Sequence, residues 1–368
     1  MSQSKLRILL IGGGGIGIVT AYALETGGLA EVTAILRSNY AVVEKNGFTI
    51  DSVDHGYIQG WRPSHTRNTI PNKEEKIFDY LILTTKNIPD IPPALPDIIA
   101  PAVTPSHTSI ILIQNGVNIE HPFRERFPTN PIISGVSFTS ATEVKPGFIR
   151  HDDYDRVRLG PFPHPRNQDP SDSELSAKAT TATQTFITAY NPNANINTNN
   201  CTIDVQFDID VPATCWRKLI YNASFNPISA ILRMDITRMR VYEHVIDELV
   251  KPAMREVVAV AGALGIRVVS RGEDEEGVIG QAIRCDPPEA FFRPSMCQDV
   301  EKGNYMEIEN IVGEPLREGE KLGVPTPTLR TIYAILKGLQ MKVKEQRGFV
   351  EPKFNEKSQY AGKSESMA

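Results

Sequence analysis

A glycine-rich turn follows the first apolar run of the chain, Ile8–Ile11. Gly12, Gly14 and Gly17 occupy the positions of a G-x-G-x-x-G pattern, and a helical stretch continues from Ile18 to about Glu25. In a dinucleotide site the first glycine permits the tight turn, the second lets the backbone approach a pyrophosphate, and the third lets the helix pack on the strand. The segment therefore predicts a dinucleotide site rather than a purely steric turn, with contacts from Gly12, Gly13, Gly14, Gly15, Ile16 and Gly17.

The end of the second apolar run indicates which dinucleotide is bound. Glu31–Leu36 is typical of a strand, and Arg37, Ser38 and Asn39 follow it. Sites for NAD carry an Asp or Glu here, about 20 residues past the loop, to accept hydrogen bonds from the ribose. An arginine can instead pair with a 2′-phosphate through charge-assisted hydrogen bonds. Arg37 therefore favours NADP(H), with an ordinary solvated arginine as the alternative interpretation.

A lysine and two asparagines recur at helical spacing in the second half of the chain. Lys218, Asn222 and Asn226 are each four positions apart, which predicts that they share one face of a helix over Thr214–Leu232. Asparagine is a mediocre helix former, so its repetition among apolar residues is unusual for a plain surface helix. A lysine partly removed from water can polarise a ketone and donate a proton to the developing alkoxide. On spacing alone, a solvated polar face is an equally good interpretation.

A third polar segment begins at Ser295. This serine precedes a helical run, where the commonest role of serine is that of a helix N-cap. Glu307 and Glu309 fall on different faces of the helix expected over Asn304–Leu322, so only one of them can easily face a given cleft. Ordinary solvent exposure is the alternative for both glutamates.

The first half of the chain alternates strands with helical stretches. Continuous apolar runs are typical of parallel strands that are covered on both faces, and ligands bind at the carboxyl ends of such strands. Lys86 and Asn115 stand at two of these ends and are candidate ligand contacts by position. The further strands that we expect are Phe78–Thr84, Ser109–Ile113 and Ile132–Phe138, with antiparallel strands between Phe148 and Pro161 closing the same sheet.

The pattern becomes helical from about Pro212. Apolar residues recur at helical spacing over Thr214–Leu232, Tyr242–Leu264, Gly277–Ile283, Asn304–Leu322 and Thr328–Lys344. We therefore expect an α/β dinucleotide-binding domain over residues 1–205, an all-helical domain over residues 206–346, and a polar, disordered tail over residues 347–368. Polar stretches near Pro161 and Asn191 predict surface loops.

Composition excludes several classes of protein. The chain has 368 residues, of which 40% are hydrophobic and 23% charged, as expected for a globular protein of about two domains. A net charge of -5 argues against general nucleic-acid binding, and no apolar run approaches the roughly 20 residues of a membrane span. Four cysteines without C-x-x-C spacing and seven histidines without H-x-x-x-H spacing indicate no metal site. With no room for a signal peptide before the first strand, we expect a cytoplasmic protein without nucleic-acid or membrane partners.

Six segments, taken in order, resemble the ketopantoate reductase (2-dehydropantoate 2-reductase) family. They are IGGGGIG, ILRSN, TTKN, IQNG, WRKLIYNASFNPISA and PSMCQDVEKGNYMEIENIVG, and the resemblance extends from Leu6 to about Lys344. It implies a Rossmann-type NADP-binding domain followed by a helical domain like that of 6-phosphogluconate dehydrogenase. It also implies NADPH-dependent reduction of 2-dehydropantoate to pantoate, on the route to pantothenate. The sequence leaves the oligomeric state open, a homodimer included.

The resemblance gives each candidate residue a role. Lys218 resembles the family's catalytic lysine and proton donor, and Asn222 and Asn226 match its substrate-binding asparagines. The other implied roles are substrate binding by Ser295, contacts to both cofactor and substrate by Asn115, a catalytic, site-ordering and cofactor-contacting role for Glu307, and cofactor contacts by Lys86 and Arg37. A looser local match brings Ser140–Ala141 near the nicotinamide.

Two departures from the family pattern lie on the substrate side. Leu232–Asp235 replaces a more polar turn, and Met306 stands where a threonine often precedes the glutamate. The identity of the 2-oxo acid therefore stays open. The alternatives are a reductase of another branched 2-oxo acid, an opine-type dehydrogenase and a non-catalytic NADP(H)-sensing module. The last alternative predicts a degraded catalytic set, whereas the lysine, both asparagines, the serine and the glutamate are all present.

Overall fold

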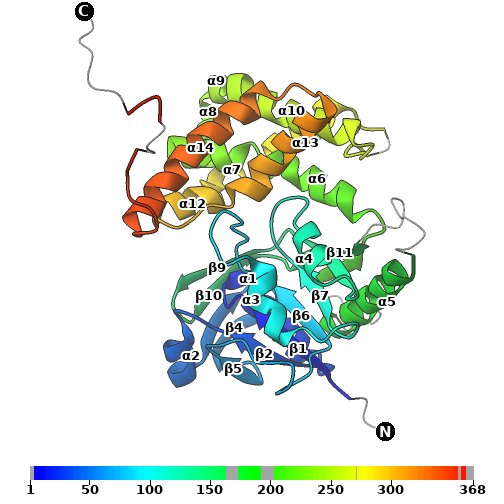
Figure 1. The fold of residues 1–368 in the computed structure, drawn as a ribbon. Helices are drawn as coiled ribbons and strands as arrows, with labels where there is room; N and C mark the ends of the chain where they lie inside the picture. Colours follow the sequence, from blue (N-terminus) through cyan, green and yellow to red (C-terminus); the bar gives the residue numbers. More distant parts are fainter. Residues whose placement is uncertain (1–3, 163–172, 192–202, 271, 355–357, 362–368) are drawn as a thin grey trace, which may run out of the picture.

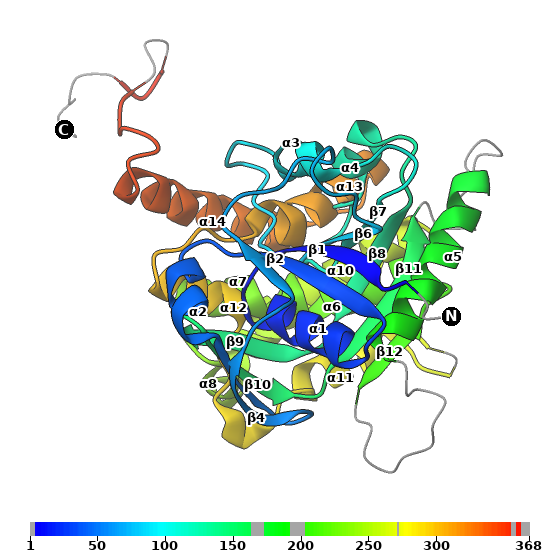
Figure 2. The same cartoon turned by 90° about the horizontal axis from the view of Figure 1, so that it is seen from below.

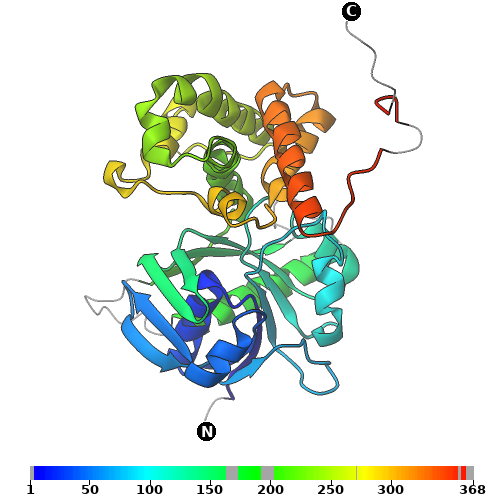
Figure 3. The ribbon, with the colours of Figure 1, turned by 90° about the vertical axis from the view of Figure 1, so that its left-hand side faces the viewer.

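The computed structural model describes residues 4–162, 173–191, 203–270, 272–354 and 358–361. Its N-terminal half contains two β-sheets with their covering helices, and its C-terminal half, from Val211 onward, is helical (Figure 1). Figure 3 shows the helical half, coloured green to orange, stacked above both sheets. The predicted combination of an α/β part and an all-α part is confirmed.

The main sheet has eight strands in the order β5-β2-β1-β6-β7-β8-β11-β12. Neighbouring strands are parallel except for the antiparallel pair β8 and β11. The chain starts in the middle at β1 and adds strands outward on both sides, which is the doubly wound Rossmann arrangement with its ligand crevice between β1 and β6. The strands are β1 Leu6–Ile11, β2 Ala30–Ile35, β5 His65–Arg67, β6 Tyr80–Leu83, β7 Ser109–Leu112, β8 Ile132–Ser137, β11 Arg156–Phe162 and β12 Asp204–Phe207.

Alternate residues of the central strands are buried in two separate cores. Ile8 and Leu10 of β1 pack with helices α1 (Gly15–Thr26) and α5 (Ser173–Tyr190). Leu9 and Ile11 face the opposite core, which is completed by α3 (Leu95–Ile99) and α4 (His121–Arg126). In Figure 2, α1 lies on one side of β1 and β2, and α3 and α4 lie on the other. Burial on both faces confirms that the continuous apolar runs are parallel strands.

A second sheet has the strand order β4-β3-β10-β9. Our expectation that all strands between Phe148 and Pro161 close the main sheet is wrong, because only β11 does so, while β10 pairs with β3 and β9. In β10, Ile149 and His151 are buried and Arg150 is exposed, which is the alternation of a sheet covered on one face. The bounds are β3 Phe48–Ser52, β4 Gly56–Trp61, β9 Ser140–Lys145 and β10 Phe148–Asp153.

Three of the long predicted helices are interrupted next to a proline. The stretch Thr214–Leu232 divides into α6 and α7, and π-helical turns at Ile246–Val250 and Glu309–Gly313 precede α10 and α13. Pro227, Pro252 and Pro315 stand just inside the helices that follow these breaks, and a proline has no N–H with which to continue the hydrogen-bond ladder. The helices of this half are α6 Val211–Asn222, α7 Phe225–Leu232, α8 Ile236–Val241, α9 Glu243–Val245, α10 Lys251–Ala263, α11 Glu275–Arg284, α12 Ser295–Glu301, α13 Glu314–Leu322 and α14 Pro327–Gln346.

Several elements were not expected from the sequence. They are α2 (Tyr40–Asn46), α3, α4, α5, α8, the short 3-10 turns at Ala100–Ala102 and Pro288–Ala290, and the strands β3, β4, β5, β9 and β12. Strand β12 runs across position 205, where we placed the end of the first domain. Helix α14 ends at Gln346, directly before the predicted tail. Pro161 lies in β11, and most of the two predicted loops and part of the tail lie outside the described residues. Within the described ranges, no helix is long and apolar enough to cross a membrane.

Candidate active site

The glycines of the turn have different structural roles. Gly12 has a φ of 127°, and a Cβ there would clash with the backbone of Thr85 and the side chain of Thr84. A Cβ on Gly17 would clash with the carbonyl of Gly12, so both glycines are required by the protein itself. Gly14 is different, because it is exposed and, among the described residues other than its two chain neighbours, no atom lies within 4 Å of where its Cβ would be. The middle glycine therefore leaves open space of the kind that a pyrophosphate would fill.

The two intervening glycines fix the turn against its neighbours. A Cβ on Gly13 would clash with Leu36, and one on Gly15 would clash with the backbone of Ala141 in β9. Asn39 donates to the carbonyl of Gly13 over 2.9 Å. Helix α1 begins at Gly15 and has no side-chain cap, so its first N–H groups are free to bind phosphate. Ile16, in the same first turn, is partly buried.

Two cationic side chains lie on the strand-end edge of the main sheet. Arg37 follows β2 and is exposed, close to the turn since its neighbour Asn39 binds Gly13. Lys86 follows β6 and is half-exposed, and its ammonium pairs with the buried carboxylate of Asp299 from α12. This ion pair joins the sheet half to the helical half.

Lys218 is held across the junction of the two halves. Its Nζ donates to Oδ1 of Asn115 over 2.9 Å and to the carbonyl of Ser137 over 2.5 Å. The same nitrogen lies 5.7 Å from the centre of the Phe138 ring, within the range of a cation–π contact. The helical half therefore supplies the amine, and the ends of β7 and β8 supply its acceptors.

Glu307 approaches the same junction from the other side. Its carboxylate is buried and accepts the backbone N–H of Asn87 over 3.0 Å. Glu309 instead pairs with Arg317 and accepts from the hydroxyl of Tyr333, away from this carboxylate. The two glutamates thus have different partners, although Glu307 precedes the helical segment that starts at Ile308 and does not lie on one of its faces.

The two asparagines lie on two helices rather than one. The hydroxyl of Ser224 donates to the carbonyl of Ile220, and α6 ends at Asn222 before α7 begins. Asn222 donates weakly to Oδ1 of Asn115 over 3.4 Å. Asn226 is buried, and its Oδ1 has no hydrogen-bond partner among the residues that the structure describes. A buried amide oxygen without a partner is costly, so it indicates a place for a ligand donor.

Ser295 and Asp299 share one helix at the mouth of the junction. Ser295 is exposed and is the first residue of α12, whereas the N-cap position is occupied by Pro294, so the N-cap expectation is wrong. Asp299 follows it by one helical turn and holds Lys86. The sequence analysis missed Asp299, although its spacing of four from Ser295 was the available signal.

Burial shifts the pKa values of both Lys218 and Glu307, and the charge of Glu307 acts on Lys218. Removal from water lowers the pKa of Lys218 to about 8, while the charge of Glu307 acts in the opposite direction. Burial raises the pKa of Glu307 to about 7, opposed by the hydrogen bond from Asn87 and the charge of Lys86. An amine and a carboxyl that both titrate near neutrality are suited to proton transfer.

A Rossmann sheet with an open glycine turn, placed under a helical half that directs a lysine to the strand ends, is the architecture of a dinucleotide-dependent oxidoreductase. Family models for ketopantoate reductase PanE/ApbA match residues 8–164, and those for its C-terminal part match residues 210–340. The chain belongs to the ketopantoate reductase family, whose members are NAD(P)-dependent oxidoreductases of 2-oxo and 2-hydroxy acids.

Individual relatives cover nearly the whole chain. An uncharacterized protein of Saccharomyces cerevisiae, YDL144C, is 34% identical over 374 residues, spanning 96% of this chain and 98% of the relative. A 2-dehydropantoate 2-reductase of a Nostoc species is 26% identical over 341 residues, spanning 92% of this chain and 96% of the relative. The crystal structure of 2-dehydropantoate 2-reductase from Methylococcus capsulatus matches with a TM-score of 0.73 and 28% identity, covering 92% of this chain and 98% of that one.

Proposed function

We propose that this protein reduces 2-dehydropantoate to pantoate with NADPH, a step of pantothenate synthesis, in the cytoplasm. The observation that carries the proposal is the Lys218 amine, held by Asn115 and Ser137 above the strand ends that also carry the glycine turn. The hydride that reduces the ketone carbon comes from NADPH when it is bound. Lys218 stabilises the developing alkoxide and donates the proton that completes the hydroxyl group.

The residues around the turn fit a phosphorylated dinucleotide. The open space at Gly14 and the uncapped start of α1 suit the pyrophosphate. Arg37 is exposed directly after β2, at the place where an acid would select NAD. It is therefore the residue that we propose for the 2′-phosphate, with Lys86 as a further cationic contact once its pair with Asp299 opens.

The polar groups beyond Lys218 fit a hydroxylated oxo acid. Asn226 offers a buried amide oxygen that needs a donor, and the 4-hydroxyl of 2-dehydropantoate would supply one. Asn222 and Asn115 lie beside the amine, where they can bind the carboxylate or the ketone oxygen. Ser295, exposed at the start of α12, is the proposed contact at the mouth of the site.

A matched pair of substrates tests this assignment. 3,3-Dimethyl-2-oxobutanoate lacks only the 4-hydroxyl of 2-dehydropantoate, and we expect its kcat/KM to be lower by about 10- to 100-fold, because Asn226 is then left unpaired. Asn226→Ala should bring the two values together by lowering that of 2-dehydropantoate. The measurement is NADPH oxidation at 340 nm, with NADH in parallel. Equal kcat/KM values for the two acids in the unaltered protein would show that the protein does not recognise the 4-hydroxyl of the substrate.

The same assay separates the other functions. Oxidation only in the presence of an amino acid would assign an opine-type dehydrogenase, and a preference for another member of a 2-oxo acid panel would assign that acid. NADPH binding without oxidation by any acid would assign a sensing module.

The pH dependence provides a second test. Reduction requires the ammonium form of Lys218, so we expect kcat to fall above about pH 8 instead of near the pKa of about 10.4 of an ordinary lysine. Oxidation of pantoate requires the free amine and should rise through the same pH. Glu307→Gln removes a charge that favours the ammonium form, so the alkaline limb should move to lower pH. If the alkaline limb of the kcat profile stays at the same pH in Glu307→Gln, then Glu307 does not influence the pKa of Lys218.

A further inference from the structure

The chain turns a corner at residues 137–139, where it passes from the main sheet to the second sheet. Strand β8 ends at Ser137 and β9 begins at Ser140. The corner presents two groups to Lys218, the Ser137 carbonyl at 2.5 Å and the ring of Phe138 at 5.7 Å from its Nζ. The position of the amine therefore depends on how this corner is held.

The far side of the corner reaches the glycine turn. The backbone of Ala141, two residues into β9, fills the space that a side chain on Gly15 would occupy. Glu143 of the same strand accepts a hydrogen bond from Asn39 over 2.8 Å, and Asn39 also binds Gly13. One continuous segment thus contacts both the proposed proton donor and the proposed pyrophosphate site.

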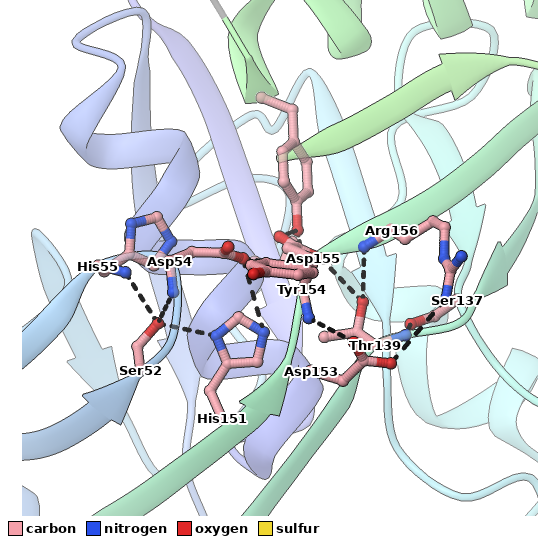
Figure 4. Close-up of polar contacts among 12 residues, drawn as sticks. Ser52, Asp54, His55, Ser137, Thr139, His151, Asp153, Tyr154, Asp155 and Arg156 are labelled. Atoms are coloured by element: carbon pink, nitrogen blue, oxygen red, sulfur yellow. Dashed lines mark hydrogen bonds and ion pairs between the residues drawn. The ribbon is translucent and has the colours of Figure 1, made fainter. Parts of the chain in front are cut away.

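Thr139 links the corner to Asp155 and Arg156 by hydrogen bonds (Figure 4). Its hydroxyl donates to Oδ1 of Asp155 over 2.9 Å and accepts the backbone N–H of Arg156 over 3.1 Å. Its own N–H donates to the hydroxyl of Ser137 over 3.2 Å, and the N–H of Phe138 donates to the carbonyl of Arg156 over 2.8 Å. The carbonyl that receives Lys218 is therefore fixed through Thr139 to the turn between β10 and β11.

Asp155 is itself held on several sides. It is 2% exposed, and its Oδ2 accepts the hydroxyl of Tyr190 over 2.6 Å. Its N–H donates to the carboxylate of Asp54 over 2.8 Å. Burial raises the pKa of Asp155, and the charge of Asp54 raises it further. The hydroxyls of Tyr190 and Thr139 and the charge of His151 lower it. A buried carboxylate with this many fixed donors is a rigid support.

The neighbouring side chains do not form a separate catalytic site. The hydroxyl of Ser52 lies 2.8 Å from Nδ1 of His151, and Nε2 of His151 lies 3.8 Å from the carboxylate of Asp54 (Figure 4). The side chains of His151 and Asp54 are 0% and 1% exposed, so no substrate can reach them. This Ser, His and Asp group belongs to the support behind Asp155.

We propose that Thr139 and Asp155 are positioning residues of the reductase reaction, holding the Ser137 carbonyl and the Phe138 ring in the place that directs Lys218 at the substrate. The inference rests on the proposed function of Lys218. It assigns a task to the polar cluster that holds the corner at residues 137–139. Small displacements of this kind cost about 10²-fold in rate when they misplace a reacting group.

Thr108 provides a matched control for Thr139. Its buried hydroxyl also donates one hydrogen bond, to the carbonyl of Phe78, and accepts one, from the N–H of Thr104, but it lies away from Lys218 at the start of β7. Thr139→Val and Thr108→Val therefore remove similar bonds, and we expect both to lower the melting temperature. Only Thr139→Val should lower kcat, by about 10- to 100-fold, and Thr139→Ser should restore it to within about threefold.

The pKa of Lys218 distinguishes a positioning role of Thr139 and Asp155 from a role in stability alone, because a loss of stability alone would not change this pKa. A carbonyl that accepts from the ammonium form favours that form, so losing its placement should lower the pKa of Lys218. The midpoint can be followed by NMR of cofactor-free protein with ¹³C-labelled lysine, assigned with Lys218→Arg, and by the alkaline limb of kcat. Both should move to lower pH in Thr139→Val and in Asp155→Asn, and should stay in place in Thr108→Val.

The inference is overturned if Thr139→Val matches Thr108→Val in kcat and in the Lys218 midpoint, because the anchor is then only structural. It is also overturned if the loss is confined to NADPH affinity, measured by fluorescence without substrate. If Asp155→Asn does not fold, the Thr139 variants decide alone. Full turnover in a protein without the Lys218 amine would refute the proposed function itself, which is a different outcome from normal turnover in Thr139→Val.

Discussion

Replacing Lys218 by methionine should lower kcat for 2-oxo acid reduction by about 10²- to 10⁴-fold, which is the usual contribution of a positioned proton donor. Methionine keeps most of the length of the side chain but cannot donate a proton or stabilise an alkoxide. The hydrogen bonds to Asn115 and Ser137 would be lost, whereas the glycine turn does not contact this side chain. We therefore expect NADPH to bind with a dissociation constant within about threefold of the original, a difference of less than about 0.7 kcal/mol.

A surface lysine supplies the control. Lys321 is largely exposed and pairs with Glu318, its neighbour one turn away, so Lys321→Met should leave kcat unchanged. Single-turnover oxidation of NADPH, together with fluorescence titration of the cofactor, separates chemistry from binding. Turnover in Lys218→Met close to that of Lys321→Met would show that Lys218 is not the proton donor.

Gly14→Ala should abolish most NADPH binding without harming the fold. The backbone at Gly14 has φ -84° and ψ -172°, which any residue can adopt, and the added methyl meets no protein atom within 4 Å. The melting temperature without cofactor should therefore stay the same or rise slightly, since alanine restricts the unfolded chain. The methyl would occupy the proposed pyrophosphate space, and we expect the dissociation constant to rise by about 10- to 100-fold, or roughly 1.4–2.8 kcal/mol.

Two further glycines complete this test. Gly262 lies exposed in α10 with equally open surroundings, so Gly262→Ala should leave NADPH binding unchanged and raise the melting temperature slightly, because alanine is the better helix former. Gly17→Ala should lower both, because its methyl would clash with the backbone carbonyl of Gly12. Calorimetry with and without NADPH measures both quantities. Normal NADPH affinity in Gly14→Ala would show that the cofactor does not pass over this turn.

The sequence predicted the elements whose signals are local. The glycine pattern and the apolar runs gave the strands and the first helix, because a parallel strand buried on both faces needs no partner to be recognised. The second sheet was missed, since β9 and β10 carry mixed polar residues and acquire their buried face only by packing over α1. The helix breaks near Pro227, Pro252 and Pro315 were signalled by the prolines but were outweighed by the helical spacing around them.

In the candidate site, too, the sequence predicted what depends on local spacing and missed what depends on packing. Spacing alone grouped Lys218, Asn222 and Asn226, whereas in the structure Lys218 and Asn222 share the acceptor Asn115 and Asn226 lies on a separate helix, α7. The buried acceptor of Asn226, its most informative property, is visible only once the surrounding helices are packed.

By itself, the sequence determined the chemical types that this protein can bring to a dinucleotide and an oxo acid, because residue identity and spacing within one element are local properties. The tertiary structure decided which of these groups meet. The contacts of Lys218 with Asn115 and Ser137 span 103 and 81 positions, and the pair of Lys86 with Asp299 spans 213. No local pattern encodes such contacts, since they exist only when the helical half packs on the strand ends of the sheet.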